Sequence, residues 1–143
     1  MLIRQISVFV ENKKGRLAEI TKVIGDAGID IRALSVADTT DFGILRLIVD
    51  RPEDAVLHLK EAGMAVSLTD VVAVCLDDRP GAFYNVVQLL SDGDMNIEYM
   101  YAFLGRSPDK AYVVMRLEDP GQGVKLLKEK GVTVVSGEEI YGL

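Results

Sequence analysis

The sequence predicts an α+β fold of two tandem ferredoxin-like βαββαβ units, each an antiparallel sheet with its helices on one face. Two observations lead to this prediction. The first is an internal duplication, in which the pattern of residues 6–17 is repeated 66 residues later in residues 72–83. The second is the order of the hydrophobic patterns, which reads strand, helix, strand, strand, helix, strand in both copies.

The first copy is residues 1–69. Its first helix is expected between a turn at Gly15 and a left-handed cap at Gly28, because glycine adopts that backbone conformation without a side-chain clash. Its second helix has Pro52 in the first turn and ends at Gly63. The expected strands are residues 3–10, 29–37, 43–49 and 65–69, with residues 38–41 joining the second to the third.

The second copy is residues 70–143 and repeats this order. One helix is expected from Gly81 to Ser91, and another begins at the capping residue Asp119 and ends at Gly131. The expected strands are residues 71–76, 95–104, 111–117 and 132–135. The tail, residues 136–143, has no assignment, although Ile140, Tyr141 and Leu143 suggest that it packs against something.

The two copies are expected to form a rigid pair. Each has about 70 residues, which is too few to bury a generous core alone. Only about three residues, 68–70, separate the two units. In each unit the second and fourth strands are expected at the sheet edges, where unpaired backbone groups invite pairing.

Composition narrows the classes of function. A net charge of −6 argues against a nucleic-acid partner, because binding to phosphates depends on clustered Lys and Arg. The first residues show neither a signal peptide nor a membrane span, so a soluble cytoplasmic protein without membrane partners is expected. The single cysteine, Cys75, lies in an apolar run and is expected to be a buried strand residue.

The turns before the first helix of each copy carry the most specific motif. In the second copy this turn reads Asp78-Arg79-Pro80-Gly81-Ala82-Phe83, and the second strand opens with Met95-Asn96-Ile97. On these motifs the chain resembles the ACT domain, the amino-acid-sensing module of many metabolic enzymes, twice over its whole length. The first copy departs from the motif, with Asn12 for the aspartate, Lys14 for the proline and Asp30 for the asparagine.

The chemistry of the turn suits an amino acid. Glycine at a strand-to-helix junction lets a ligand approach the backbone, and the first amides of a helix can hold a carboxylate. Asn96 and Asp30 offer acceptors for an ammonium group. The resemblance implies that turn and acceptor meet across an interface between domains, although both motifs are also ordinary turn sequences. The candidate ligand-binding residues are Asn12, Gly15, Arg16, Leu17, Asp30, Ile31, Asp78, Arg79, Pro80, Gly81, Ala82, Phe83, Asn96 and Ile97.

One strand differs between the copies. Three small residues in the first copy correspond, at the offset of 66, to three aromatic residues in the second. The pairs are Ala33 and Tyr99, Ser35 and Tyr101, and Ala37 and Phe103. Two interpretations stay open, since the aromatic side chains could contact a ligand or could complete the core of the second copy.

Other functions find little support. The single histidine, His58, lies on a helix where a surface role is favoured over catalysis, and no residue spacing fits a metal site. We therefore predict a non-catalytic regulatory protein without a metal or cofactor. It would bind a free amino acid and act in trans, on a separate metabolic enzyme or as a homodimer. The alternative is a ligand-free scaffold or regulatory subunit that works through its exposed sheet edges.

Overall fold

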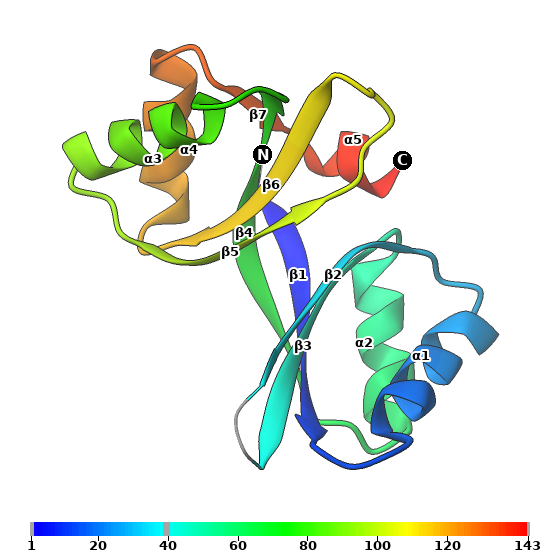
Figure 1. Cartoon of the computed structure of the whole chain (residues 1–143). Coiled ribbons are helices and arrows are strands. Elements are labelled where there is room, and N and C mark those ends of the chain that lie inside the picture. The colour runs from blue at the N-terminus through cyan, green and yellow to red at the C-terminus, as the bar shows by residue number, and fades with distance from the viewer. Residues whose placement is uncertain (1, 39–40, 143) are drawn as a thin grey trace. The chain divides into compact units, whose positions relative to one another are not determined.

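The computed structural model describes residues 2–38 and 41–142, and its contacts divide the chain into two compact units (Figure 1). The N-terminal unit is Arg4–Thr69, and the C-terminal unit is residues 70–143 together with the first residues up to Ile3. The contacts divide the chain between residues 69 and 70, where the sequence divides the two copies, and the predicted domains, residues 1–69 and 70–143, stay a prediction.

The N-terminal unit has the predicted topology. β1 and β2 both pair antiparallel with β3. Phe9 N–H donates to the carbonyl of Ala65 at 3.0 Å, which brings the start of β4 beside β1. The strand order is therefore β2-β3-β1-β4. The elements are β1 (Ile3–Glu11), α1 (Arg16–Asp26), β2 (Ile31–Asp38), β3 (Phe42–Val49), α2 (Pro52–Glu61) and the first residues of β4 (Val66–Asp77).

The C-terminal unit repeats this arrangement. β4 pairs antiparallel with both β6 and β7, and β5 pairs antiparallel with β6, so the order is β7-β4-β6-β5. The elements after β4 are α3 (Ala82–Asp92), β5 (Ile97–Phe103), β6 (Lys110–Leu117), α4 (Pro120–Glu129), β7 (Thr133–Val135) and α5 (Gly137–Tyr141). The unassigned tail thus holds a short helix whose Ile140 is buried. Leu143 lies outside the described residues.

The strand β4 corrects one expectation. The sequence predicted two strands, at 65–69 and 71–76, with a short separator, but residues 66–77 form one continuous strand. No glycine or proline interrupts this stretch, so nothing in it stops an extended backbone from continuing.

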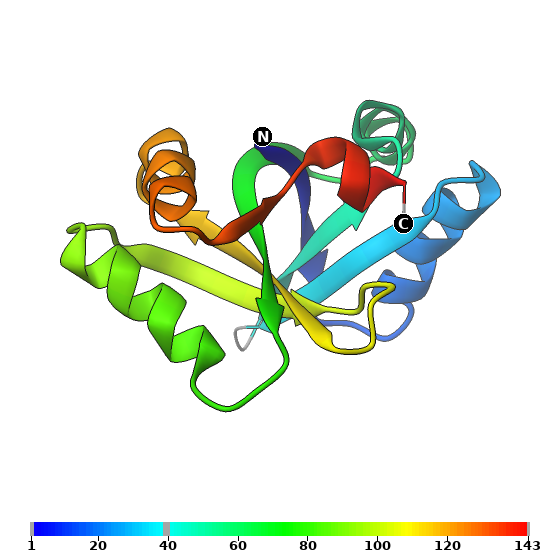
Figure 2. The same cartoon turned by 90° about the horizontal axis from the view of Figure 1, so that it is seen from above.

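Each unit has its own hydrophobic core on one face of its sheet (Figures 1 and 2). In the N-terminal unit, Ile20 of α1 and Leu59 of α2 share one cluster with alternate residues of β1 and β3. In the C-terminal unit, Leu90 of α3 and Leu127 of α4 do the same with β4 and β6. Both helices of each unit therefore cover the same sheet face, as predicted. No helix within the described residues is long and apolar enough to cross a membrane.

Two single residues complete the comparison. Cys75 lies on β4 but is partly exposed, so the expectation of a buried cysteine is wrong. Its neighbours Val74 and Leu76 point into the core, and alternation along a strand sends Cys75 to the opposite face. His58 is exposed on α2, in keeping with a surface role.

Candidate functional site

The two strand-to-helix turns share one backbone geometry. Gly15 has φ +87° and Gly81 has φ +86°, a region that side chains other than glycine's disfavour. A Cβ added at either glycine would meet nothing within 4 Å. Backbone conformation, not crowding, therefore requires glycine here. The N-cap residue of α1 and of α3 is this glycine, which has no side chain to accept a hydrogen bond from the first helix amides.

Both turns are anchored to the loop between the second and third strands of their unit. Asn12 N–H donates to the carbonyl of Asp41 at 3.1 Å, and Asp78 N–H donates to that of Asp109 at 2.9 Å. Each turn consequently lies at the end of the edge strand of its unit, since that loop follows β2 in one unit and β5 in the other.

The charges around the turns differ. In the first turn the Lys13 ammonium lies 3.0 Å from Glu11, and Arg16 lies 3.1 Å from Glu19. The hydrogen bond from Lys13 lowers the pKa of Glu11, with the nearby positive charges as the second cause. The remaining turn candidate, Leu17, is 44% exposed on the first turn of α1.

In the second turn the ammonium of Lys110 lies 2.5 Å from Asp77. Its hydrogen bond lowers the pKa of the Asp77 carboxyl and raises the pKa of Lys110. Arg79 lies 4.0 Å from the same carboxylate. The candidates Pro80, Ala82 and Phe83 follow, and Ala82 begins α3.

The starts of the two edge strands are also unlike. Asp30 lies before β2, where its carboxylate is 2.7 Å from Arg32, and its backbone N–H donates to Asp50 at 3.0 Å. Ile31 follows and packs against the core. The Asp30 carboxylate is therefore already engaged by a cation of its own strand, which weakens it as an acceptor for a ligand ammonium.

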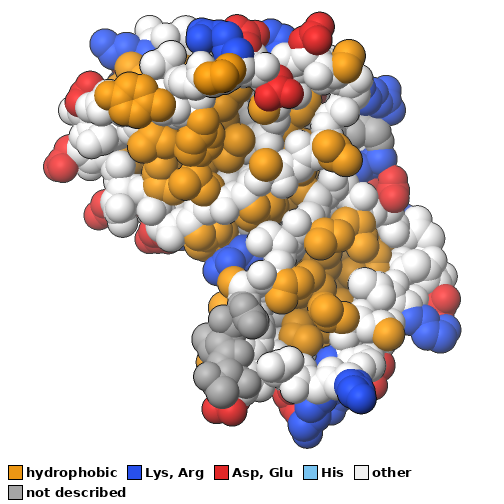
Figure 3. Space-filling view, in the orientation of Figure 1, with side chains coloured by type: hydrophobic (Ala, Val, Ile, Leu, Met, Phe, Trp, Pro, Cys, Tyr) orange, Lys and Arg blue, Asp and Glu red, His pale blue; other side chains and the backbone are white. Residues whose placement is uncertain are grey.

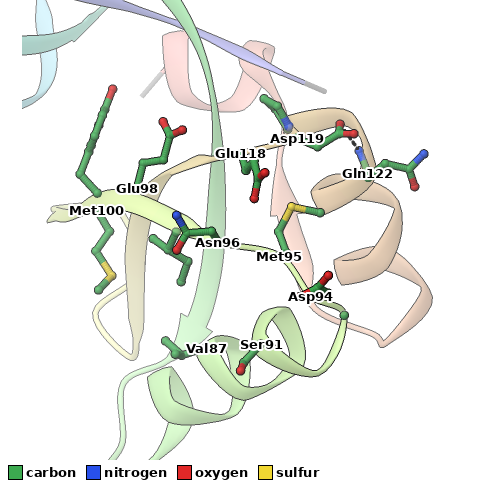
Figure 4. Close-up of a pocket in the computed structure, with 14 residues that line it drawn as sticks. Val87, Ser91, Asp94, Met95, Asn96, Glu98, Met100, Glu118, Asp119 and Gln122 are labelled. Carbon is green, nitrogen blue, oxygen red and sulfur yellow. Dashed lines mark hydrogen bonds between the residues drawn. The ribbon is translucent and has the colours of Figure 1, made fainter.

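The start of β5 lies in a hollow of about 1390 Å³ in the C-terminal unit (Figure 4). The candidates Asn96 and Ile97 line it. Figure 4 shows α3 on one side, with Val87 and Ser91, and the start of α4 on the other. Four acidic side chains and no cation are among its lining residues, all of which the structure describes. These acids are Asp94, Glu98, Glu118 and Asp119.

Three of these acidic residues have a local structural role as well. Asp119 caps α4, as predicted, by accepting a hydrogen bond from the Gln122 N–H at 3.1 Å (Figure 4). Glu98 lies 3.4 Å from Arg116 on the neighbouring strand. Glu118 donates its backbone N–H to the carbonyl of Asn96 at 3.1 Å, which holds the start of β5 against the end of β6.

Within one unit, the glycine turn and the strand start do not meet. Gly81 precedes α3 and Asn96 follows it, and a helix of 11 residues is about 16 Å long. The same separation divides Gly15 from Asp30 across α1. One amino acid therefore cannot contact the turn and the strand start of the same unit.

Sequence reasoning missed the acidic lining of the hollow. Glu98 and Asp119 stand where the first copy has Arg32 and Arg51, at offsets of 66 and 68. Comparing charges position by position between the copies would have found this difference. Neither position belongs to the motif that the two copies share.

The aromatic residues of β5 lie on the sheet face opposite the core. Met100 pairs with the core residue Met115, so its neighbours Tyr99 and Tyr101 point the other way. None of the three aromatics belongs to the core cluster under the helices. The interpretation that they complete this core is wrong, and Tyr99 instead lines the hollow.

Comparison with known proteins agrees with this fold. A family model described as an ACT domain pair matches residues 1–143. The chain belongs to this family. The ACT domain pair is a regulatory type of module rather than a catalytic one. No protein of curated function matches the chain.

Solved structures resemble this ACT domain pair over nearly its whole length. Protein BT0572 from Bacteroides thetaiotaomicron is 40% identical, with a TM-score of 0.94, covering 100% of this chain and 98% of that one. The ligand-free regulatory subunit of aspartate kinase from Thermus thermophilus is 17% identical, with a TM-score of 0.66, over 91% and 94% of the two chains. The corresponding subunit from Thermus flavus is 15% identical, with a TM-score of 0.62, over 90% and 93%. The two kinase subunits share its fold.

Proposed function

We propose that this ACT domain pair is a sensor that binds a free amino acid between a glycine turn and a strand start of two different units. It would then regulate a separate metabolic enzyme in trans. The observation that carries this proposal is the pair of helix N-termini behind Gly15 and Gly81, alike in backbone and without a side-chain cap. Helix amides in that geometry hold a carboxylate, the group that all amino acids share.

The strand starts supply the second half of the site. The ammonium of an amino acid needs acceptors, and the hollow around Asn96 provides an amide oxygen beside several carboxylates. At the start of β2, Arg32 already engages the Asp30 carboxylate. We therefore expect the site that uses Asn96 to be the stronger of the two.

Calorimetry and thermal unfolding with the twenty amino acids test the proposal, with nucleotides and metal ions as controls. A ligand that binds the native state stabilises it by about 2.7 kcal/mol at a hundredfold excess over its Kd. We expect one amino acid, or one chemical group of them, to raise the unfolding temperature. If none does, and calorimetry shows no heat of binding, the sensor function is wrong and a scaffold function is favoured.

Three glycine variants then locate the carboxylate site. Gly15→Val and Gly81→Val place a branched side chain at the turn, and each costs about 1–2 kcal/mol of backbone strain. Gly63→Val is the matched control, because Gly63 has φ +84°, has open space around its added Cβ and lies after α2. We expect all three to lose stability and only a turn variant to lose binding.

Asn96→Ala tests the acceptor at the other end of the ligand. It removes the amide side chain without changing the backbone pairing of Asn96 with Glu118. We expect Kd for the amino acid to rise about tenfold, the value of one hydrogen bond to a charged group. Binding as tight as in the unmodified protein would place the site elsewhere.

A further inference from the structure

The N-terminal unit holds a guanidinium group at the start of its second helix. Arg51 precedes α2, and its guanidinium donates to the carbonyls of Ala27 and Gly28 at 3.2 and 2.8 Å. These carbonyls lie just after α1, where the last C=O groups of a helix have no partner within the helix. The same guanidinium donates to the Asp54 carboxylate at 3.0 Å and lies 4.0 Å from that of Asp50. Two carbonyls and two carboxylates therefore surround this cation.

Each residue that contacts Arg51 has a counterpart in the C-terminal unit, at an offset of 66 before the third strand and of 68 after it. The backbone agrees with this correspondence. Asp50 donates its N–H to the carbonyl of Asp30 at 3.1 Å, and its counterpart Glu118 donates to that of Asn96 at the same 3.1 Å. All four counterparts line the hollow at the start of β5. They are Gly93, Asp94, Glu118 and Gln122.

The arginine itself has no counterpart. Asp119 stands at the place of Arg51, and its carboxylate caps α4. In the part of the chain that the structure describes, no side chain donates to the carbonyls of Gly93 and Asp94. Asp94 also adds a carboxylate where the N-terminal unit has Gly28. The acceptors that surround a guanidinium in one unit are thus present in the other unit without the cation.

The hollow offers apolar contacts as well as acceptors. Its volume is about 1390 Å³, and apolar side chains line it beside the acids (Figure 4). Figure 3 shows hydrophobic side chains gathered on the visible surface of this unit. An arginine side chain has an apolar stem and a planar cationic head, so it can pack against the first kind of group and donate to the second. The apolar lining residues are Val87, Met95, Ile97 and Met100.

We infer that this hollow binds the guanidinium group of free arginine. The group donates to the carbonyls of Gly93 and Asp94 and to the surrounding carboxylates, as Arg51 does in the N-terminal unit. The ammonium of lysine is a point charge without the planar fork of donors, so it fits this set of acceptors less well. The inference rests on the proposed function, in which Asn96 accepts from the ligand ammonium and a glycine turn holds its carboxylate, and it names the amino acid.

Calorimetry with related ligands measures the contribution of the guanidinium in the unmodified protein. L-Arginine has both the guanidinium and the carboxylate, L-citrulline has a neutral urea group in place of the guanidinium, and agmatine lacks the carboxylate. We expect the Kd of arginine to be at least about tenfold lower than that of citrulline, because hydrogen bonds between charged groups are the stronger ones. L-Lysine should bind with a Kd between the two.

The variant Asp119→Arg gives the C-terminal unit the arginine that the N-terminal unit has. Its own guanidinium should take the acceptors and raise the Kd of free arginine at least about tenfold. Asp119→Asn keeps a good N-cap for α4 and removes one exposed charge, so a rise of about threefold is expected. Glu61→Arg makes the same change of charge at the end of α2 in the other unit and should leave the Kd unchanged. Circular dichroism checks that each variant is folded.

The outcomes separate this inference from the proposed function. A neutral or acidic amino acid that binds more tightly than arginine would overturn the inference and leave the sensor function standing, as would equal affinities for arginine and citrulline. A folded Asp119→Arg protein that binds arginine unchanged would also overturn it. Equal affinities for arginine and agmatine would instead contradict a carboxylate site at a glycine turn and leave the guanidinium site in place. If neither arginine nor agmatine binds, the inference is wrong whatever the other amino acids do.

Discussion

The N-terminal and C-terminal units keep one turn geometry and surround it with different chemistry. Gly15 and Gly81 agree in φ to one degree, 87° against 86°, although Lys14 precedes one and Pro80 the other. The strand starts do not agree, because an arginine in one unit stands where a glutamate stands in the other. We therefore expect a difference in affinity between the two candidate sites to come from charge near the strand start and not from turn shape.

The two hydrophobic cores likewise have different residues at matching positions. At the end of the third strand the N-terminal unit has Val49 and the C-terminal unit has the larger Leu117. In the helix that follows, the N-terminal unit has Ala55 and the C-terminal unit has Gly123, and both residues are buried. Leu117 and Gly123 thus fill together the volume that Val49 and Ala55 fill in the other copy.

The largest expected effect comes from breaking that exchange with Gly123→Ala. The added Cβ would lie 2.3 Å from Cδ1 of Leu117, which is fully buried and cannot turn away freely. Overpacking of this kind costs about 1–3 kcal/mol, and alanine returns about 1 kcal/mol through its helix propensity. We expect a net loss of about 1 kcal/mol in the free energy of unfolding, measured by urea denaturation.

The double variant tests the reason for that loss. Gly123→Ala with Leu117→Val recreates in the C-terminal unit the pair that the N-terminal unit uses. Its free energy of unfolding should lie closer to that of the unmodified protein than the sum of the single effects predicts. Additive losses would show that the two positions do not share one volume.

Most of the fold could be predicted because duplication and hydrophobic period act together. Each element is indicated twice, once in each copy, and the two indications support one another. Glycines with left-handed φ at residues 28, 63 and 131 also end helices where the hydrophobic pattern predicted their ends. The continuous strand β4 was not predicted, because hydrophobic periodicity does not show that a single strand belongs to both units. The helix α5 was missed because five residues are too few to show a helical period. Its N-cap is Ser136, whose hydroxyl accepts a hydrogen bond from the Glu139 N–H.

The candidate site was predictable only in part. The turns could be predicted because their backbone needs a left-handed conformation, which a glycine in the sequence indicates. The acids of the hollow come from the turn after α3, from β5, from the residue that follows β6 and from the N-cap of α4, and their convergence depends on the sheet register. Residues such as Glu98 and Glu118 are 20 positions apart in the chain. No local motif connects them.

A smaller effect is expected where the ends of the first helices differ. Asp94 has φ +58°, whereas the matching residue of the N-terminal unit is Gly28, with φ +69°. Asp94→Gly removes strain in the folded state but adds freedom to the unfolded chain, so a gain of about 0.5 kcal/mol is expected. Gly28→Ala, the matched change in the other unit, should lose about 1 kcal/mol. Thermal unfolding measures both, and a loss of stability in Asp94→Gly would show that the aspartate side chain contributes more than its backbone costs.

The smallest effect concerns the acid that opens each turn, whose pKa is lowered in both units. Lys13 donates to Glu11 from two residues away, whereas Lys110 meets Asp77 only through the register of β4 and β6. The pair in the first turn can therefore form in the unfolded chain, and the pair in the second turn cannot. Only the shift at Asp77 is then linked to folding.

The sign of this linkage follows from the direction of the shift. A carboxyl whose folded pKa lies below its ordinary value of 3.8 adds stability above that pH, and the contribution is lost as pH falls through the folded pKa. Both groups are exposed, so the effect on stability is small. In an NMR titration, Lys110→Met should raise the pKa of Asp77 toward 3.8, and it should reduce the stability difference between about pH 6 and pH 3. Lys13→Met should raise the pKa of Glu11 without changing that difference, and an equal change in both variants would contradict the distinction between the two turns.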